Sequence, residues 1–301
     1  MTPFSSSSGS GRVLRLEDGR RMAYREYGAR DGWPVLALHG TPASKLMFSI
    51  AETTSAKLGL RLIAPDRWGY GQTDPHPRPS LEAWARDAAE LIDALGLSQL
   101  SLVGISGGSP YAAATAALLG DRVVRMALAV PVGPIAATAV EHRLSLLHRL
   151  IFMGVGRRPG LTRFIFRAYR QLAAWKPRRA VSLVALGQCR ADRALLRTPA
   201  VQDFLSTMLR DGLERGVQGP AIDLTLFASP WNISLERICA ATRIWIGNDD
   251  QLVPLSAARH LASAIPDAEL TELEGYGHFW IAQDYSEVLD WLAGSRLKVT
   301  P

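Results

Sequence analysis

Short apolar runs alternate with longer helical patterns over the first half of this 301-residue chain. The runs at residues 35–38, 60–64, 100–105 and 124–130 predict buried strands. Residues 81–95 predict a helix, with Ser80 as its N-cap and Gly96 as its stop. Strands and helices in this order form βαβ units, so we expect an α/β fold with a mostly parallel, twisted sheet flanked by helices.

The alternation stops after residue 134. Residues 135–233 show helical periodicity and no convincing strand, and strand patterns resume at 243–247 and 269–273 before a last helix at 286–292. An insertion of this length exceeds a simple crossover and suits a lid. We therefore expect a core at 11–134 and 234–301, a helical cap at 135–233, and a flexible Ser- and Gly-rich tail at 1–10.

One helical pattern in the expected cap separates basic from apolar residues. Arg163, Arg167 and Arg170 fall on one face, and the apolar residues fall opposite (Leu161, Phe164, Ile165, Ala168 and Leu172). Such a helix can lie on a membrane surface. A solvated basic face over an apolar inner face is the more common arrangement, and we favour it.

Composition narrows the function classes. The formal net charge is +6 and the sequence pI is about 9.6, but Lys and Arg are spread over the chain, so we expect a basic solvated surface and no nucleic-acid partner. The most apolar stretch, 123–140, contains Arg125, Pro131 and Pro134 and predicts no membrane span. Two distant cysteines and no signal peptide favour the cytoplasm.

A serine follows the third predicted strand in a glycine-rich turn. Residues 104–108, Gly-Ile-Ser-Gly-Gly, match G-x-S-x-G between that strand and an Ala-rich helical pattern at 110–119. On such a tight turn Gly104 and Gly108 avoid collisions, and the helix N-terminus favours negative charge. The same pattern also fits a plain βα turn, so the assignment of Ser106 as a nucleophile depends on the rest of the chain.

A serine nucleophile needs an adjacent base. Of six histidines, His39 and His278 lie at the ends of core strands. His39 stands between an apolar run and Gly40, so we expect it to be buried and structural. His278 lies in a glycine-containing loop after the last predicted strand and is the preferred base.

The base needs a carboxylate, and the tetrahedral intermediate needs N–H donors. Asp249 and Asp250 both follow the strand at 243–247, and the residues alone leave either possible. Gly107 offers one N–H beside the serine. The loop His39-Gly-Thr-Pro42 offers the other from Thr41, because Pro42 has none.

These segments resemble the α/β-hydrolase fold superfamily in the form with a serine nucleophile and a helical lid. The matching segments are the oxyanion loop at 39–42, D-x-x-G-x-G-x-S/T at 66–73, the nucleophile elbow at 104–108 and the histidine loop at 277–278. The family pattern G-x-x-D-x-x-x-P falls on Gly247, Asp250 and Pro254, which implies Asp250 as the acid. The resemblance covers residues 11–134 and 234–301 and implies no cofactor or metal. Serine at 106 argues against dehalogenases and epoxide hydrolases, which use aspartate there.

The triad Ser106, Asp250 and His278 predicts an enzyme that cleaves an ester or related acyl bond of a small, largely apolar substrate. The same fold also supports C–C bond hydrolysis, lyase or cofactor-free peroxidase chemistry, peptide hydrolysis or a non-catalytic small-ligand receptor. An aminopeptidase would need an acidic anchor for the amine, with candidates in the cap (Glu141, Asp192, Asp203, Asp211, Glu214 and Asp223). The oligomeric state is not predicted.

Overall fold

A computed structural model of the chain describes residues 11–137 and 144–294. The predicted tail at 1–10, part of the predicted cap and Glu141 lie outside the described residues. The strands are β1 (Arg12–Arg15), β2 (Arg21–Gly28), β3 (Trp33–Leu38), β4 (Leu60–Pro65), β5 (Leu100–Ile105), β6 (Val123–Ala129), β7 (Ala241–Gly247) and β8 (Glu269–Leu273).

The eight strands form one sheet in the order β1-β2-β4-β3-β5-β6-β7-β8. β2 pairs antiparallel with β1 and with β4, and every other pair of neighbours is parallel. The predicted α/β class with a mostly parallel sheet is therefore confirmed. β1 and β2 were not predicted, because β2 buries Met22, Ala23 and Tyr24 in succession and so lacks the alternation of a half-buried strand. β6 ends one residue before the predicted end, because Val130 has φ 44° and leaves the extended conformation.

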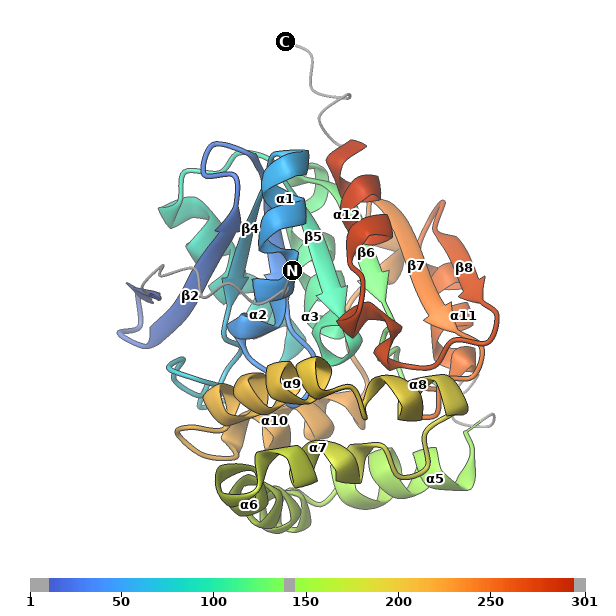
Figure 1. Cartoon of the computed structure of the whole chain (residues 1–301). Coiled ribbons are helices and arrows are strands. Elements are labelled where there is room, and N and C mark those ends of the chain that lie inside the picture. Colours follow the sequence, from blue (N-terminus) through green and yellow to red (C-terminus); the bar gives the residue numbers. More distant parts are fainter. Residues whose placement is uncertain (1–10, 138–143, 295–301) are drawn as a thin grey trace.

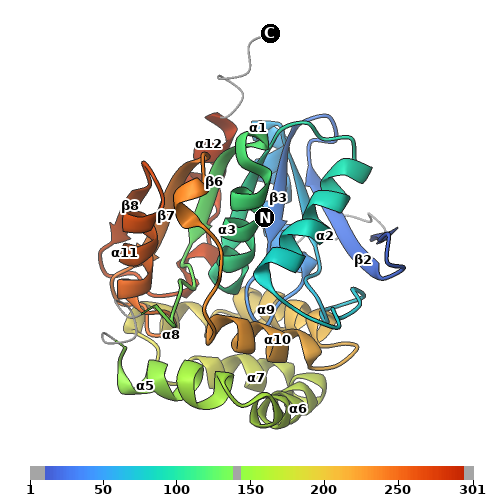
Figure 2. The ribbon, with the colours of Figure 1, turned by 180° about the vertical axis from the view of Figure 1, so that it is seen from behind.

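Helices cover both faces of the sheet (Figures 1 and 2). α1 (Glu52–Leu58) and α12 (Ser286–Ala293) lie on one face, and α2 (Leu81–Ala94), α3 (Ser109–Leu119) and α11 (Leu255–Ala264) lie on the other. Alternate residues of β5 supply the two cores. Leu102 packs in the core beneath α2, α3 and α11, and Val103 packs in the core beneath α12.

The described residues between β6 and β7 contain helices and no strand. They are α5 (Leu146–His148), a π-helical stretch (Arg149–Gly156), α6 (Pro159–Trp175), α7 (Pro177–Val184), α8 (Arg190–Leu195), α9 (Pro199–Gly212) and α10 (Gln218–Phe227). Figure 1 shows them gathered at the end of the sheet toward which the arrows of β5 and β7 point. They therefore cover the carboxyl ends of the parallel strands, where open α/β sheets form their sites. In the described part of the chain, no helix is both long and apolar enough to cross a membrane.

The prediction that the apolar face of α6 packs inward is wrong. Leu161, Phe164 and Ile165 are 41%, 68% and 40% exposed. The inward stripe is instead Thr162, Phe166, Tyr169 and Ala173, spaced as one side of a helix, which packs against α7 and α10. Thr162 and Ala173 on this stripe are buried and small enough to let the neighbouring helices approach closely.

Candidate active site

Ser106 lies at a sharp turn from β5 into α3. Its φ is 52°, which is the left-handed region that side chains other than glycine rarely adopt. The turn needs glycine on both sides. A Cβ on Gly104 would lie 2.8 Å from Ser109 Cα, and a Cβ on Gly108 would overlap the carbonyl of Leu38. The strained turn holds the hydroxyl at the carboxyl edge of the sheet, beside the N-terminus of α3.

A continuous line of hydrogen bonds joins three side chains from distant parts of the sequence. Ser106 Oγ lies 3.0 Å from His278 Nε2, and His278 Nδ1 lies 2.7 Å from Asp250 Oδ2. Asp250 Oδ1 accepts backbone N–H groups from Leu252 and Val253, at 2.8 and 3.0 Å. The loop after β7 thus fixes the carboxylate, which holds the imidazole toward the serine.

The neighbouring aspartate takes no part in this line. Asp249 is exposed, and its side chain makes no hydrogen bond to a described residue. Its backbone N–H donates to Tyr276 O at 3.0 Å, which connects the loop after β7 to the loop that carries His278. Only Asp250 has the geometry to orient His278.

Burial does not separate the two candidate bases. His39 is fully buried as expected, but His278 is also buried, with only 7% exposed. Their partners differ. His39 Nε2 accepts the N–H of Arg67 at 3.0 Å and Nδ1 faces Gly40 O at 2.8 Å, so both nitrogens are occupied by backbone groups. Burial also holds the pKa of His39 well below its usual value, which keeps the ring neutral.

The environment of His278 favours its charged form. Burial lowers its pKa, but the charge and hydrogen bond of Asp250, with the charge of Asp192, outweigh burial. The pKa therefore lies above the ordinary value of 6.5. A base with a raised pKa accepts the serine proton more readily, provided that the pH is high enough to leave it neutral at the start.

Asp192 on α8 holds the histidine loop from the cap side. Its carboxylate accepts the backbone N–H of His278 at 2.7 Å and that of Phe279 at 2.9 Å. This approach requires glycine at 277, because a Cβ there would overlap the Asp192 carboxylate. The Gly277-His278 pair therefore has a steric reason that the sequence alone did not supply.

A second buried carboxylate holds the predicted oxyanion loop at 39–42. Arg67 donates to the carbonyls of His39 and Gly40, at 3.1 and 3.0 Å, and to Thr41 Oγ1 at 2.9 Å. Asp223 on α10 pairs with Arg67 and accepts the Thr41 hydroxyl. The segment at 66–73 thus contributes Arg67, which holds residues 39–41 of this loop by hydrogen bonds.

The two predicted oxyanion donors lie on adjacent backbone segments. A Cβ on Gly107 would overlap the side chain of Thr41, so the loop after β3 and the residue after Ser106 are in close contact. Their role as oxyanion donors stays a prediction. The pairing of Arg67 with Asp223 was not predicted, although an acid flanked by Ile222 and Leu224 in an apolar helix indicates a buried partner.

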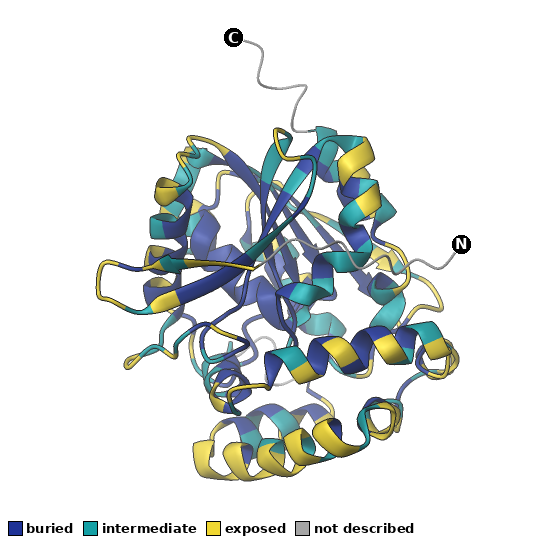
Figure 3. Ribbon diagram, turned by 60° about the vertical axis from the view of Figure 1, so that its left-hand side comes forward, coloured by how far each residue is buried: buried dark blue, intermediate teal, exposed yellow. Residues whose placement is uncertain are grey.

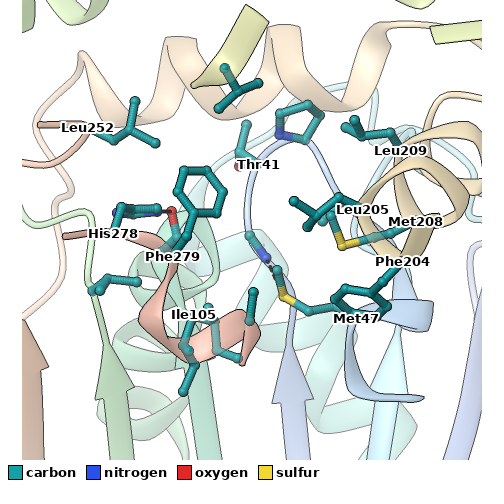
Figure 4. A pocket seen from close by; sticks show the side chains of 18 of the residues that line it. Thr41, Met47, Ile105, Phe204, Leu205, Met208, Leu209, Leu252, His278 and Phe279 are labelled. Carbon is teal, nitrogen blue, oxygen red and sulfur yellow. Dashed lines mark hydrogen bonds between the residues drawn. The ribbon is translucent and has the colours of Figure 1, made fainter. Parts of the chain in front are cut away.

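A mostly apolar cavity of about 110 Å³ opens onto Ser106 and His278. Figure 4 shows Phe204, Leu205, Met208 and Leu209, all from α9, on the side opposite His278. The described lining residues are otherwise apolar apart from Thr41, Tyr169 and Tyr285, and they include no Asp, Glu, Lys or Arg. The cavity therefore suits a small, neutral, apolar group.

The described acids among the candidate amine anchors do not line this cavity. Asp192 and Asp223 are engaged as described above, Asp203 pairs with Arg178, and Asp211 lies 3.2 Å from the buried amine of Lys45. Glu214 is exposed, and Glu141 lies outside the described residues. In the described part of the chain, the cavity thus has no carboxylate for a substrate amine.

Sequence comparison decides the family. Residues 34–285 match the alpha/beta hydrolase fold family. The chain belongs to this family. The α/β hydrolase is 27% identical over 281 residues to 2-hydroxymuconate semialdehyde hydrolase of Pseudomonas putida, covering 90% of the chain and 89% of that protein.

Solved structures show the same fold. An esterase from Exiguobacterium antarcticum superimposes on the α/β hydrolase with a TM-score of 0.69 at 21% identity, covering 94% of this chain and 99% of the esterase. A bromoperoxidase from Bacillus anthracis gives a TM-score of 0.71 at 19% identity, with the same coverage. Two solved structures named for different activities thus share this architecture, so the fold alone does not identify the reaction.

Proposed function

We propose that the chain is a serine hydrolase that cleaves an ester or related acyl bond of a small, apolar substrate. The observation that carries this proposal is the unbroken line from Ser106 through His278 to Asp250, which ends in an apolar cavity. A serine hydroxyl with a base at 3.0 Å, itself oriented by a buried carboxylate, is the arrangement that nucleophilic acyl transfer requires.

In the first half of the reaction, Ser106 Oγ attacks the acyl carbon while its proton passes to His278 Nε2. Asp250 stabilises the imidazolium and keeps its Nδ1–H in place. The acyl oxygen becomes negative and is stabilised by the N–H groups of Gly107 and Thr41, each contributing about 3 kcal/mol. The intermediate collapses, the bond to the alcohol oxygen breaks, and the departing oxygen takes the proton from His278.

Water completes the cycle. His278, neutral again, removes a proton from a water molecule as its oxygen attacks the acyl-enzyme. The second tetrahedral intermediate uses the same two N–H donors. Its collapse breaks the bond to Ser106 Oγ, which recovers the proton from His278, and the carboxylic acid leaves.

The charge of the lining supports a neutral substrate. A buried charged group without a partner costs several kcal/mol, and the described lining offers neither a cation nor an anion to pair with it. Among acyl compounds, esters with short aliphatic acyl groups fit both the polarity and the size of the cavity. We also propose that the enzyme works in the reducing cytoplasm. Its two cysteines, Cys189 and Cys239, are free thiols, which supports this location.

The test compares the parent with Ser106→Ala on p-nitrophenyl esters of increasing acyl length and on carbon–carbon-bonded diketones. We expect ester turnover to be highest with short acyl groups and to fall by about 10⁶-fold in the variant. A fluorophosphonate probe should label Ser106 in the parent only. Unchanged ester turnover in Ser106→Ala, or turnover of diketones without turnover of esters, would contradict the proposal.

A further inference from the structure

The basic residues are not spread evenly when the acids are considered with them. Residues 142–191 hold 11 of the 34 Lys and Arg residues and no Asp or Glu. The remaining chain has 23 basic and 28 acidic residues, a formal net charge of −5. Basic residues do occur along the whole chain, but one continuous segment carries the whole positive excess.

The same segment exposes apolar side chains. Of the twelve large apolar residues exposed in the described part of the chain, nine lie in residues 146–186, so this exposure is concentrated in one segment. The most exposed are Leu146 at 88%, Trp175 at 74%, Leu186 at 71%, Phe164 at 68% and Leu150 at 63%. Concentrations of this kind mark interaction surfaces.

These residues belong to the helices farthest from the sheet. Figure 1 shows α5, α6 and α7 as the outermost layer, with α8, α9 and α10 between them and the core, and Figure 3 shows many exposed residues along that layer. We call the exposed side chains of residues 146–186 the outer cap face. It carries both apolar and basic side chains.

The centre of the outer cap face lies on α6. Phe164 lies next to Arg163 and one turn from Arg167, and all three are exposed. Neither arginine forms an ion pair with a described residue. At the end of the helix, the Lys176 amine lies 3.9 Å from the ring centroid of Trp175. An aromatic ring beside a cation is typical of side chains that enter the headgroup region of a bilayer.

We propose that the outer cap face binds the surface of an anionic phospholipid bilayer. Apolar side chains enter the headgroup boundary while the surrounding Arg and Lys residues pair with lipid phosphates, and no spanning helix is needed. A second copy of this chain is a poor occupant, because two faces with no acid between residues 142 and 191 repel each other. Leu146, Leu150 and Leu186 are among the most exposed residues of this face, and leucine has no ring to stack on bases. We therefore favour lipid over nucleic acid as the partner of the face.

The position of the face connects it to the candidate active site. Tyr169 on α6, and Val181 and Val184 on α7, line the cavity from the inner side of the helices whose outer side we assign to lipid. Docking would therefore set the cap wall of the apolar cavity directly above the bilayer. The lipid-binding proposal itself does not require the esterase activity.

The test is co-sedimentation of the full-length protein with vesicles of mixed phosphatidylglycerol and phosphatidylcholine, and with vesicles of phosphatidylcholine alone. We expect binding to the anionic vesicles that weakens as salt is added. The double variant Arg163→Gln/Arg167→Gln should bind about 30-fold more weakly, at about 1 kcal/mol for each charge. Phe164→Ser should bind about tenfold more weakly.

Matched controls lie on the core. Arg30→Gln/Arg78→Gln removes the same charge from exposed positions, and Leu118→Ser removes an apolar side chain that is 48% exposed on α3. These variants should bind like the parent. Circular dichroism and fluorophosphonate labelling of Ser106 report whether each variant is folded, so a binding loss and a folding failure are distinguishable.

Three results would overturn the proposal. The first is an absence of binding to anionic vesicles by the folded parent. The second is equal binding to both vesicle types, or equal losses in the core controls. The third is self-association in sedimentation experiments without lipid that the Phe164 change abolishes, which would assign the face to a second copy.

Discussion

The ion pair between Arg67 and Asp223 joins the loop after β4 to α10, next to the predicted oxyanion loop at 39–42. Both side chains are 1% exposed, and Tyr70 also donates its hydroxyl to Asp223, at 2.6 Å. Asp223→Asn keeps the shape of the side chain but leaves the guanidinium buried without a counter-ion. Removing one partner of a buried pair costs about 3–5 kcal/mol in the free energy of unfolding, which corresponds to a loss of roughly 6–20 °C in Tm.

The measurement is thermal and urea unfolding followed by circular dichroism, with Asp203→Asn as the control. Asp203 is also a cap aspartate paired with an arginine, but that pair is 57% and 60% exposed on its two side chains. We expect no resolvable change in the control, because water already solvates both charges. A double variant, Arg67→Met/Asp223→Leu, should recover part of the loss, because it removes both charges.

The same substitution should slow the reaction below the unfolding temperature. Arg67 fixes the His39 and Gly40 carbonyls, so a displaced guanidinium loosens the loop that carries the Thr41 N–H. The loss of one oxyanion donor, about 10²–10³-fold in kcat, is the upper limit of this effect. Equal stability and activity in Asp223→Asn and Asp203→Asn would refute the reasoning, as would a double variant that is less stable than Asp223→Asn.

Two further predictions concern the base and its carboxylates. Asp250→Asn should lower kcat by about 10⁴-fold on a soluble p-nitrophenyl ester, because the amide would hold the wrong tautomer of His278, whereas Asp249→Asn should not change it; comparable losses would reject Asp250 as the acid. The profile of kcat/KM against pH should rise through an apparent pKa above 6.5, since His278 must lose its proton to act as a base. Asp192→Asn removes a charge that raises this pKa, so the rising limb should move to lower pH, and an unmoved limb would exclude that role.

Central strands could be predicted because they are buried on both faces and therefore continuously apolar. β3, β4 and β5 follow this rule, and their predicted ends lie within a few residues of the observed ones. The edge strand β1 is mostly exposed, and its neighbour β2 buries three residues in succession, so neither strand shows a clear alternation. The predicted orientation of α6 was wrong for a related reason. Periodicity identifies an apolar face of a helix, but it does not show whether another element covers that face.

In the candidate site, too, some features could be predicted from the sequence and others could not. Ser106, the two histidines and the two candidate acids could be located because each follows a strand, and the ends of parallel strands meet at one edge. The choice of Asp250 over Asp249 needed either family spacing or the observed hydrogen bond to His278. Asp192 and Asp223 were only two of six candidate anchors for a substrate amine, because their partners, backbone amides and an arginine, lie far away in the sequence.

In the proposed reaction, these two carboxylates connect the helices between β6 and β7 to the catalytic groups. Asp192 on α8 fixes the loop of the base, and Asp223 on α10 fixes the loop of an oxyanion donor, so the two halves of the site are each held by a different cap helix. α9 lies between α8 and α10 in the sequence and supplies one wall of the cavity. A substitution on α9 that reshapes this wall can therefore change substrate choice independently, whereas a shift of α8 or α10 moves the base or the oxyanion donor with it. In the proposed enzyme, the cavity wall formed by α9 and the contacts that hold the two loops of the site therefore lie on different helices.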